Sequence, residues 1–244
     1  MGCTVSNTKI KACDLHGYVE ISILEALQKC ASRKDYSKLI SKNAIESIVP
    51  KVTDDLLSFT EKDPAAQSDP ILILDTYTSF SAVLHYRISH WVHQAKETNH
   101  RIYLDDALPA MIFKRGKKMS GAEIHFRSKI GERFILDHGF GTVIGETSIV
   151  GDDCYFLGGV TLGARGISTN PSCARHPIIG NRVQIGAFTA VLGRIRIGDD
   201  VFIGPNCIVT EDILDGAKVT AKPFIQIALP QTMGENKSGK TRNA

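Results

Sequence analysis

The feature that most constrains this chain is a six-residue spacing of apolar side chains that begins at residue 124. The series comprises Ile124, Ile130 and Leu136, then Ile144, Val150, Phe156 and Leu162, then Ile179, Ile185, Val191, Ile197, Ile203 and Val209. A period of six fits neither an α-helix nor a plain alternating strand, whose side chains repeat every 3.6 and 2 residues. It predicts a prism of short parallel strands with three hexads per coil, in which each apolar side chain points to the axis and stacks on its equivalent in the next coil.

The N-terminal half follows a different period. Between about residue 18 and residue 115 the apolar residues recur at intervals of three and four, which is typical of amphipathic helices. We expect helix breaks at residues 32–34 and, because proline removes a backbone donor, at Pro50 and across residues 63–70. We therefore predict an α+β protein: an all-α domain over residues 1–115, a β-helix domain over 116–230, and a polar, basic tail over 231–244 that is disordered.

The composition narrows the classes of function. A chain of 244 residues that is 43% hydrophobic can bury a substantial core. Its net charge of +3 is small and its basic residues form no extended stripe, which argues against a nucleic-acid partner. No apolar run reaches the roughly 18 residues of a membrane span, and the cysteines contain no C-x-x-C pair. We expect a cytoplasmic protein with reduced thiols.

The first six residues fit the M-G-x-x-x-[ST] pattern for N-myristoylation, and Cys3, beside Gly2, could carry palmitate. So short a pattern arises often by chance, and it matters only if the source is eukaryotic. We favour an unmodified, frayed terminus and leave acylation open.

The six-residue register slips by two residues just after Leu136, and breaks in a solenoid are where sites tend to be built. This segment contains Asp137 and His138. Histidine has an unperturbed pKa of about 6.5, so it can be the general base in acyl transfer from a thioester to an alcohol. A carboxylate can orient such a base. Glu123 precedes His138 by 15 residues, a little under one coil of roughly 18, so the fold could bring the two together.

The second break is a long insertion over residues 165–177, and it contains Arg175 and His176. The planar guanidinium of arginine is suited to bidentate contact with a carboxylate. A zwitterionic amino acid is therefore a natural acceptor for the acyl group.

Taken together, these segments resemble the serine O-acetyltransferases, a family of hexapeptide-repeat acyltransferases. In the second half of the chain the similarity is carried by EIH at 123–125, LDHG at 136–139, VIGET at 143–147, GVTLG at 159–163, RHP at 175–177 and IGA at 185–187. In the helical half it is carried by DPAA at 63–66, by Tyr77 and Phe80, and by YRISHW at 86–91. The resemblance covers roughly residues 60–210 and implies a left-handed parallel β-helix behind a helical domain.

The resemblance implies transfer of acetyl from acetyl-CoA to the hydroxyl of L-serine, giving O-acetylserine and CoA for cysteine biosynthesis. It implies that His138 is the general base and that Glu123 orients it. Asp137 and Asp63 are expected to receive the amino and hydroxyl groups of the substrate. Arg175 and His176 are expected to hold its carboxylate.

The resemblance also implies that acetyl-CoA lies along the outside of the prism, between two subunits of a homotrimer, and that the helical domains pair trimers into hexamers. The residues expected to contact acetyl-CoA are Gly163, Ala164, Gly186, Ala187 and Lys222. No metal is expected. His90 and His93 have a spacing that a metal could use, but packing within a helix explains them more simply.

Several positions depart from the family pattern. Glu123 stands where aspartate is usual, and Phe126 where proline is usual. Residues 163–166 read GARG in place of GGTG, the loop to Arg175 is a few residues longer, and residues 221–225 read AKPFI in place of G-V-P-A-[KR]. The last two residues are Asn and Ala, without the terminal isoleucine by which many members dock into cysteine synthase, so that complex is not expected.

Other hypotheses stay open at this point. One is the same chemistry on another acceptor, such as homoserine or a diamino acid, which the change at Glu123 and the long loop motivate. Another is a non-catalytic relative, against which the presence of His138, Asp137 and Arg175 argues. A carbonic-anhydrase-like metal enzyme would need three histidines across subunits, which the spacing does not clearly provide. Feedback inhibition by cysteine and the choice between trimer and hexamer are also undecided.

Overall fold

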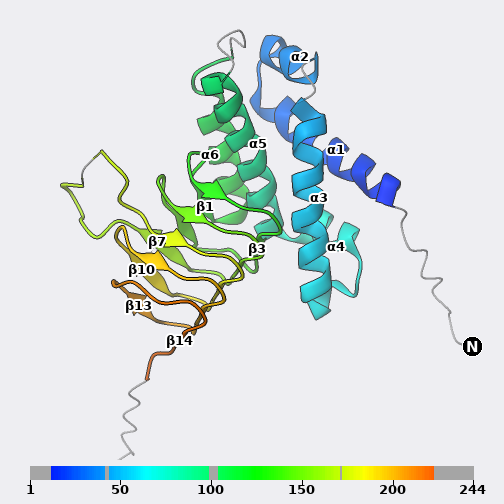
Figure 1. Ribbon diagram of the computed structural model, residues 1–244. Coiled ribbons are helices and arrows are strands. Elements are labelled where there is room, and N and C mark those ends of the chain that lie inside the picture. Colours follow the sequence, from blue (N-terminus) through cyan, green and yellow to red (C-terminus); the bar gives the residue numbers. More distant parts are fainter. Residues whose placement is uncertain (1–11, 42–43, 99–103, 171, 223–244) are drawn as a thin grey trace, which may run out of the picture.

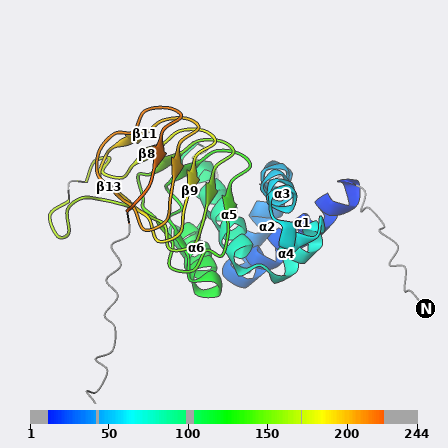
Figure 2. The same cartoon turned by 90° about the horizontal axis from the view of Figure 1, so that it is seen from below.

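The computed structural model describes residues 12–41, 44–98, 104–170 and 172–222. Within these ranges the N-terminal half is helical: α1 (Ala12–Cys30), α2 (Arg33–Ser41), α3 (Ala44–Lys62), the 3-10 turn η1 (Pro64–Ala66), α4 (Pro70–Thr76), α5 (Thr78–Thr98) and α6 (Leu108–Ser120). Helices α5 and α6 pack together against the first strands of the prism, and α1 to α4 lie to one side (Figures 1 and 2). The Gly2/Cys3 pattern and residues 223–244, with the predicted tail and chain end, lie outside the described residues.

Two aspartates cap the short helices η1 and α4, which lie between α3 and α5. Asp63 accepts a hydrogen bond from Ala65 N at 2.8 Å, and Asp69 accepts one from Ile71 N at 2.9 Å. In each case a proline follows the capping residue, where its missing N–H costs nothing and its fixed φ suits the first helical turn. The helix break expected across residues 63–70 is therefore present.

The helix break expected at Pro50 is wrong, because α3 continues through Pro50 to Lys62. Proline forfeits one intrahelical hydrogen bond and costs roughly 3 kcal/mol inside a helix. The apolar face of α3 outweighs this cost, because each fully buried aliphatic or aromatic side chain contributes about 1.5–3 kcal/mol. The buried apolar side chains of that face include Ile48, Val52, Leu56 and Phe59.

Helix α6 ends at Ser120, and the capping residue Gly121 has φ of 72°, the left-handed conformation that favours glycine at a helix C-terminus. The basic run at 114–118 lies within α6, and Lys117 and Lys118 are in its last turn, where cations complement the helix dipole. The first strand begins at Glu123. The change from helix to strand therefore lies at residues 120–123, slightly after the predicted domain division at 115.

The second half of the described chain forms three parallel sheets. Sheet A has the order β1-β4-β7-β10-β13, sheet B the order β11-β8-β5-β2, and sheet C the order β14-β12-β9-β6-β3. The strands are β1 (Glu123–Ile124), β2 (Lys129–Ile130), β3 (Ile135–Leu136), β4 (Val143–Ile144), β5 (Ile149–Val150), β6 (Tyr155–Phe156), β7 (Thr161–Gly163), β8 (Ile178–Ile179), β9 (Gln184–Ile185), β10 (Ala190–Leu192), β11 (Arg196–Ile197), β12 (Phe202–Ile203), β13 (Ile208–Val209) and β14 (Lys218–Val219). From β1 to β13 consecutive strands visit A, B and C in turn, which is the predicted prism. In the last coil an isolated bridge between Ile213 and Ile197 replaces a strand of sheet B, and β14 follows in sheet C.

The register of the sheets follows the six-residue pattern. In sheet A, Ile124 pairs with Ile144, Ile144 with Leu162, and Leu162 with Val191. These side chains are almost fully buried and belong to one apolar core along the prism axis. The predicted stacking of equivalent residues between coils is confirmed.

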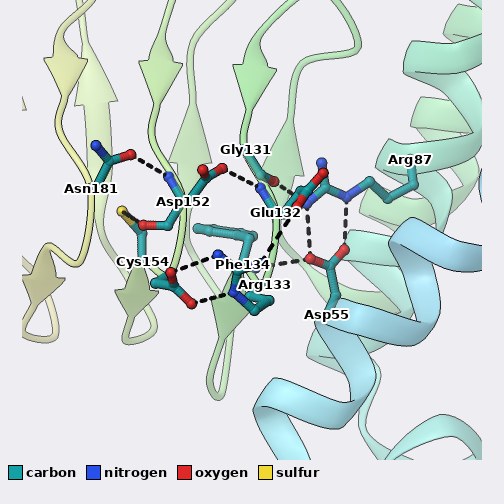
Figure 3. Close-up of polar contacts among 10 residues, drawn as sticks. Asp55, Arg87, Gly131, Glu132, Arg133, Phe134, Asp152, Cys154 and Asn181 are labelled. Atoms are coloured by element: carbon teal, nitrogen blue, oxygen red, sulfur yellow. Dashed lines mark hydrogen bonds and ion pairs between the residues drawn. The ribbon is translucent and has the colours of Figure 1, made fainter.

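Hereafter the segments that join sheet C to A, A to B, and B to C are called the CA, AB and BC corners. The BC corner shows how the coils are linked (Figure 3). Asp152 accepts from Glu132 N at 2.8 Å, and Asn181 accepts from Asp152 N at 2.9 Å. Beside this ladder, Arg133 makes a bidentate ion pair with Asp153 of the next coil. Polar side chains at this corner thus satisfy the backbone donors that the turns leave unpaired.

Two residues of α5 join the helical domain to the first coil. The hydroxyl of Tyr86 donates to Ser128 O at 2.9 Å and accepts from Ile130 N at 3.0 Å. Arg87 makes a bidentate pair with Asp55 of α3, with nitrogen–oxygen distances of 2.7 and 2.9 Å (Figure 3). It also donates to Ile130 O. The first turn of the prism is therefore fixed by groups from two helices.

Two further observations concern the class of protein. In the described ranges no helix combines the length and apolar character that a membrane crossing requires. Among the cysteines whose side chains the structure describes, Cys30, Cys154, Cys173 and Cys207 are free thiols.

Candidate active site

His138 lies at a CA corner that is longer than its neighbours. Six residues (137–142) join β3 to β4, whereas four (157–160) join β6 to β7 in the next coil. The longer corner leaves the His138 side chain 81% exposed. His138 has φ of 61°, in the left-handed region, and Gly139 follows at 71°. Because a Cβ at Gly139 would lie 2.8 Å from the Cβ of Ser79, the corner packs closely on α5. The predicted base is thus presented to solvent by a tightly held turn.

Asp137 and Asp63, predicted to hold the substrate, are held by two tyrosines. Tyr155 donates its hydroxyl to Asp137 Oδ2 at 2.9 Å, and Tyr77 donates to Asp63 Oδ2 at 2.8 Å. The hydrogen bond to Asp63 raises the pKa of Tyr77, and Asp137 contributes to that rise. Burial, followed by Asp137 and then Asp63, raises the pKa of Tyr155. The two carboxylates, one from each domain, therefore act on the same two tyrosines.

His138 is next to this acidic pair. Its Nδ1 lies 3.8 Å from Asp137 Oδ1, within the distance of an ion pair. An ammonium group placed between the two acids would bring the rest of a small amino acid alongside His138.

Glu123, the acid predicted to orient His138, is paired with a lysine instead. Its carboxylate forms an ion pair with Lys117 of α6, and no hydrogen bond joins it to His138 in the described part of the chain. Its backbone nevertheless adjoins the His138 corner, because Glu123 N donates to Thr142 O at 2.8 Å.

Arg175 belongs to a second cluster, at the AB corner. It donates to Glu146 Oε2 at 2.6 Å, and Arg127 donates to Glu146 Oε1 at 2.7 Å. These two hydrogen bonds lower the pKa of Glu146 to about 2. Glu146 therefore stays ionised at neutral pH and fixes Arg175.

His176 is also held at the AB corner. Thr147 supports it on one side, with 2.8 Å between Thr147 Oγ1 and His176 Nδ1 and 3.1 Å from Thr147 N to the same atom. Accepting from Thr147 N requires an unprotonated Nδ1, and burial, followed by the charge of Arg175, lowers the pKa of His176. The imidazole ring occupies the space in which a Cβ of residue 145 would lie, so only glycine fits there. A neutral His176 could donate a hydrogen bond from Nε2.

The two clusters are separated within one chain. Asp137 and His138 precede β4, whereas Glu146 and Thr147 follow it, so the clusters occupy different corners of the prism. Arg175 and His176 return to the AB corner at the end of the long loop, which leaves the prism after β7 (Figure 1). One chain therefore brings Asp63, Asp137 and His138 together but does not bring them to Arg175 and His176.

The residues predicted to contact acetyl-CoA also lie at different corners of the prism within one chain. Gly163 ends β7 and Ala164 begins the long loop, at the AB corner. Gly186 and Ala187 follow β9 at the CA corner, and a Cβ at Gly186 would lie 2.5 Å from Pro205 N. Lys222 is exposed after β14. Among the described residues no three His, Cys, Asp or Glu side chains are grouped as metal ligands would be.

Sequence reasoning missed the residues that hold the site in place. Tyr155 lies 18 residues after Asp137, one coil of the prism, so the coil length could have paired them. Glu146 and Thr147 were noted only as part of a motif. Their contacts with Arg175 and His176 span 29 residues because the long loop intervenes, and no regular spacing reveals such a pair.

In sequence and in fold, this chain is similar to known proteins of one class. Residues 176–211 match the family model described as bacterial transferase hexapeptide (six repeats). A serine acetyltransferase of Helicobacter pylori is 40% identical over 158 residues, which are 64% of this chain and 85% of that protein. A serine acetyltransferase of Synechococcus elongatus is 37% identical over 67% of this chain, which spans 62% of that relative's length. The Neisseria gonorrhoeae serine acetyltransferase solved in complex with serine superposes with a TM-score of 0.69 at 29% identity, covering 84% of this chain and 81% of that one.

The three parallel sheets and the repeat match define a hexapeptide-repeat transferase, with a left-handed parallel β-helix behind a helical domain. Within that class, the identity and coverage of the relatives show that the chain belongs to the serine acetyltransferase family.

Proposed function

We propose that this protein transfers the acetyl group of acetyl-CoA to the hydroxyl of L-serine, giving O-acetylserine and CoA for cysteine biosynthesis. The observation that carries the proposal is the meeting of Asp63 and Asp137, from two domains, beside the exposed His138. Paired carboxylates attract an ammonium group, and a neighbouring imidazole can take the proton of a hydroxyl held there. The named relatives support the same reaction.

In the proposed reaction, neutral His138 takes the proton of the serine hydroxyl while the oxygen attacks the thioester carbonyl of acetyl-CoA. The new C–O bond gives a tetrahedral oxyanion, and its collapse breaks the C–S bond. The CoA sulfur then receives the proton back from His138. Asp137, 3.8 Å from Nδ1, stabilises the imidazolium between these two transfers.

We further propose a homotrimer whose sites lie between subunits. The CA corner of one chain would face the AB corner of the next, so that Arg175 and His176 hold the carboxylate of a serine bound beside the neighbour's His138. Such a contact is heterologous and closes into a ring. It would also bring Gly163–Ala164 to Gly186–Ala187 of the neighbour, around acetyl-CoA, with Lys222 near a CoA phosphate. Contacts between the helical domains of two trimers would give a hexamer.

Subunit complementation tests this arrangement. His138→Ala and Arg175→Ala homotrimers are each expected to be inactive. Hybrids made by unfolding and refolding the two together should regain activity, because some interfaces then contain both native residues. A hybrid preparation that stays inactive, although light scattering shows a trimer, would place the complete site within one chain.

The role of Glu123 as the acid that orients His138 remains part of the proposal. Its backbone adjoins the His138 corner, but its carboxylate would have to leave Lys117. If Glu123 acts on His138, Glu123→Gln should lower kcat and shift the acidic limb of the pH profile, whereas Lys117→Ala should not lower kcat. An unchanged kcat in Glu123→Gln would remove Glu123 from the mechanism.

The reaction itself is tested by following thiol release from acetyl-CoA with L-serine, homoserine, threonine, diaminopropionate or water alone. We expect release with serine, its loss in His138→Ala, and its retention in a matched variant, His16→Ala, which changes an exposed histidine of α1. Faster thiol release with another acceptor would identify that acceptor, and not serine, as the substrate. No release with any acceptor, from folded protein that binds acetyl-CoA, would exclude the proposed activity.

We also propose a cytoplasmic location, which the free thiols of the described cysteines support. Fractionation of source cells, followed by immunoblotting against the protein, tests it.

A further inference from the structure

A cavity of about 300 Å³ lies at the junction of the two domains, and none of the residues that line it belongs to either cluster of the candidate active site. Its lining comes from α3, α5 and the strands β2 and β5 of sheet B. The lining includes Ile48, Lys51, His90, Trp91, Lys129 and Ile130. Domain junctions are common places for ligand sites, because two elements supply the walls of the cavity.

The charges around this cavity have one sign. Every ionisable side chain of the lining is basic, and no carboxylate contributes to it. Arg87 is neutralised by Asp55, whereas the exposed Lys51 and Lys129 have no ion pair with a described carboxylate. The two free ammonium groups therefore give the cavity a positive potential that an anion would relieve.

The rest of the lining is apolar or aromatic. Ile48 and Ile130 are buried, and Trp91 is partly exposed, so an indole borders the space. His90 is fixed beside it, with 2.8 Å between its Nδ1 and Phe126 O; donation from Nδ1 leaves Nε2 as the free ring nitrogen. A basic rim with an apolar and aromatic interior matches a ligand that has a charged end and an apolar body.

We propose that this cavity binds a small organic anion, with its carboxylate or phosphate between Lys51 and Lys129 and its apolar or aromatic body against Trp91, Ile48 and Ile130. The ligand bridges α3 and α5 of the helical domain to β2 of the prism. Binding therefore stabilises the junction of the two domains, because a ligand held only by the folded chain shifts unfolding by mass action. The inference does not depend on the proposed acetyl transfer.

Trp91 provides the assay, because it is the only tryptophan of the chain. The probes are phenyl phosphate, benzoate, inorganic phosphate and the neutral benzyl alcohol, added to the full-length protein with excitation near the red edge of indole absorption. We expect a saturable fluorescence change with phenyl phosphate and benzoate, weaker binding of inorganic phosphate, and none of benzyl alcohol. The apparent affinity should fall as salt is added.

Variants locate the site. Lys51→Ala and Lys129→Ala should each weaken phenyl phosphate binding about fivefold, the order expected for loss of one exposed charge pair. The matched control is Lys114→Ala, at an exposed position of α6 outside the cavity, and it should bind like the wild type. Circular dichroism checks folding, and the melting temperature gives a second readout that does not depend on Trp91. The proposal is overturned if benzyl alcohol binds as well as the anions, if the lysine variants bind like the control, or if no probe changes fluorescence or melting.

Discussion

Replacing Asp55 by alanine would remove the carboxylate that neutralises Arg87 inside the protein. The Asp55 side chain is fully buried and that of Arg87 is 5% exposed. Asp55 Oδ1 also accepts from Phe134 N at 2.9 Å, so the substitution leaves both a buried guanidinium and a buried N–H without their partner (Figure 3). Breaking a buried ion pair from one side costs about 3–5 kcal/mol. A domain is stabilised by about 5–15 kcal/mol in total, so this is a large fraction.

Urea unfolding measures this loss. With a slope of about 2–3 kcal/mol per molar urea, the midpoint of Asp55→Ala should fall by roughly 1–2.5 M. Wild type and variant are compared at one protein concentration, because association of subunits would make the midpoint depend on it. Near-ultraviolet circular dichroism before unfolding shows whether the variant starts from a native fold.

The chain contains a matched control with the same ion-pair geometry at the surface. Arg133 and Asp153 also form a bidentate pair, but their side chains are 41% and 30% exposed. Exposed pairs contribute about 0–1 kcal/mol, so Asp153→Ala should shift the midpoint only slightly. The double variant Asp55→Leu with Arg87→Met, which replaces the charges by apolar groups, should recover much of the loss. Equal shifts for Asp55→Ala and Asp153→Ala would refute the argument from burial.

Three further predictions concern the candidate site. Tyr155→Phe removes a hydrogen bond to the Asp137 carboxylate and should raise the KM for serine about tenfold in steady-state assays, with less effect on the KM for acetyl-CoA; an unchanged KM would show that the hydroxyl does not position the acid. Gly145→Ala would displace the ring of His176 and should weaken serine binding about tenfold in titration calorimetry, whereas normal binding would exclude His176 as a serine contact. Because the pKa of Glu146 is lowered to about 2 from 4.5, its ion pairs should stabilise the fold above pH 4.5 and lose that effect as the pH falls towards 2. The stability difference between wild type and Glu146→Gln, followed from pH 7 to pH 2, should show this trend, and a difference independent of pH would contradict it.

The prism could be predicted because its repeat is a local property of the sequence. One apolar residue in six suffices to define the strands, since each strand is only two or three residues long and the same side chain position faces the axis in every coil. The predicted helix break at Pro50 was wrong because the outcome there is not a local property of the sequence. A local rule on proline was applied where the burial of a whole helix face, visible only in the folded structure, determines the outcome.

The candidate site was only partly predictable, for a related reason. His138 and Asp137 are adjacent in sequence and lie at a register slip, so the pattern marked them directly. Their approach to Asp63 depends on how the helical domain packs on the first coil, and spacing along the chain carries no information on that. Arg175 shows the same limit, because its partner Glu146 lies across a loop of irregular length.

The substitution of glutamate for the family's usual aspartate at position 123 bears on which acid supports His138. Asp137 has one oxygen held by Tyr155 and the other 3.8 Å from His138 Nδ1, so its charge is already directed at the imidazole. Glu123 has its charge offset by Lys117, and its side chain is 34% exposed. A carboxylate whose charge is already paired contributes less to stabilising a nearby imidazolium. Within one chain, therefore, Asp137 is better placed than Glu123 to support His138 in the proposed reaction, and Glu123 can add to that support only in a state where the pair with Lys117 is open.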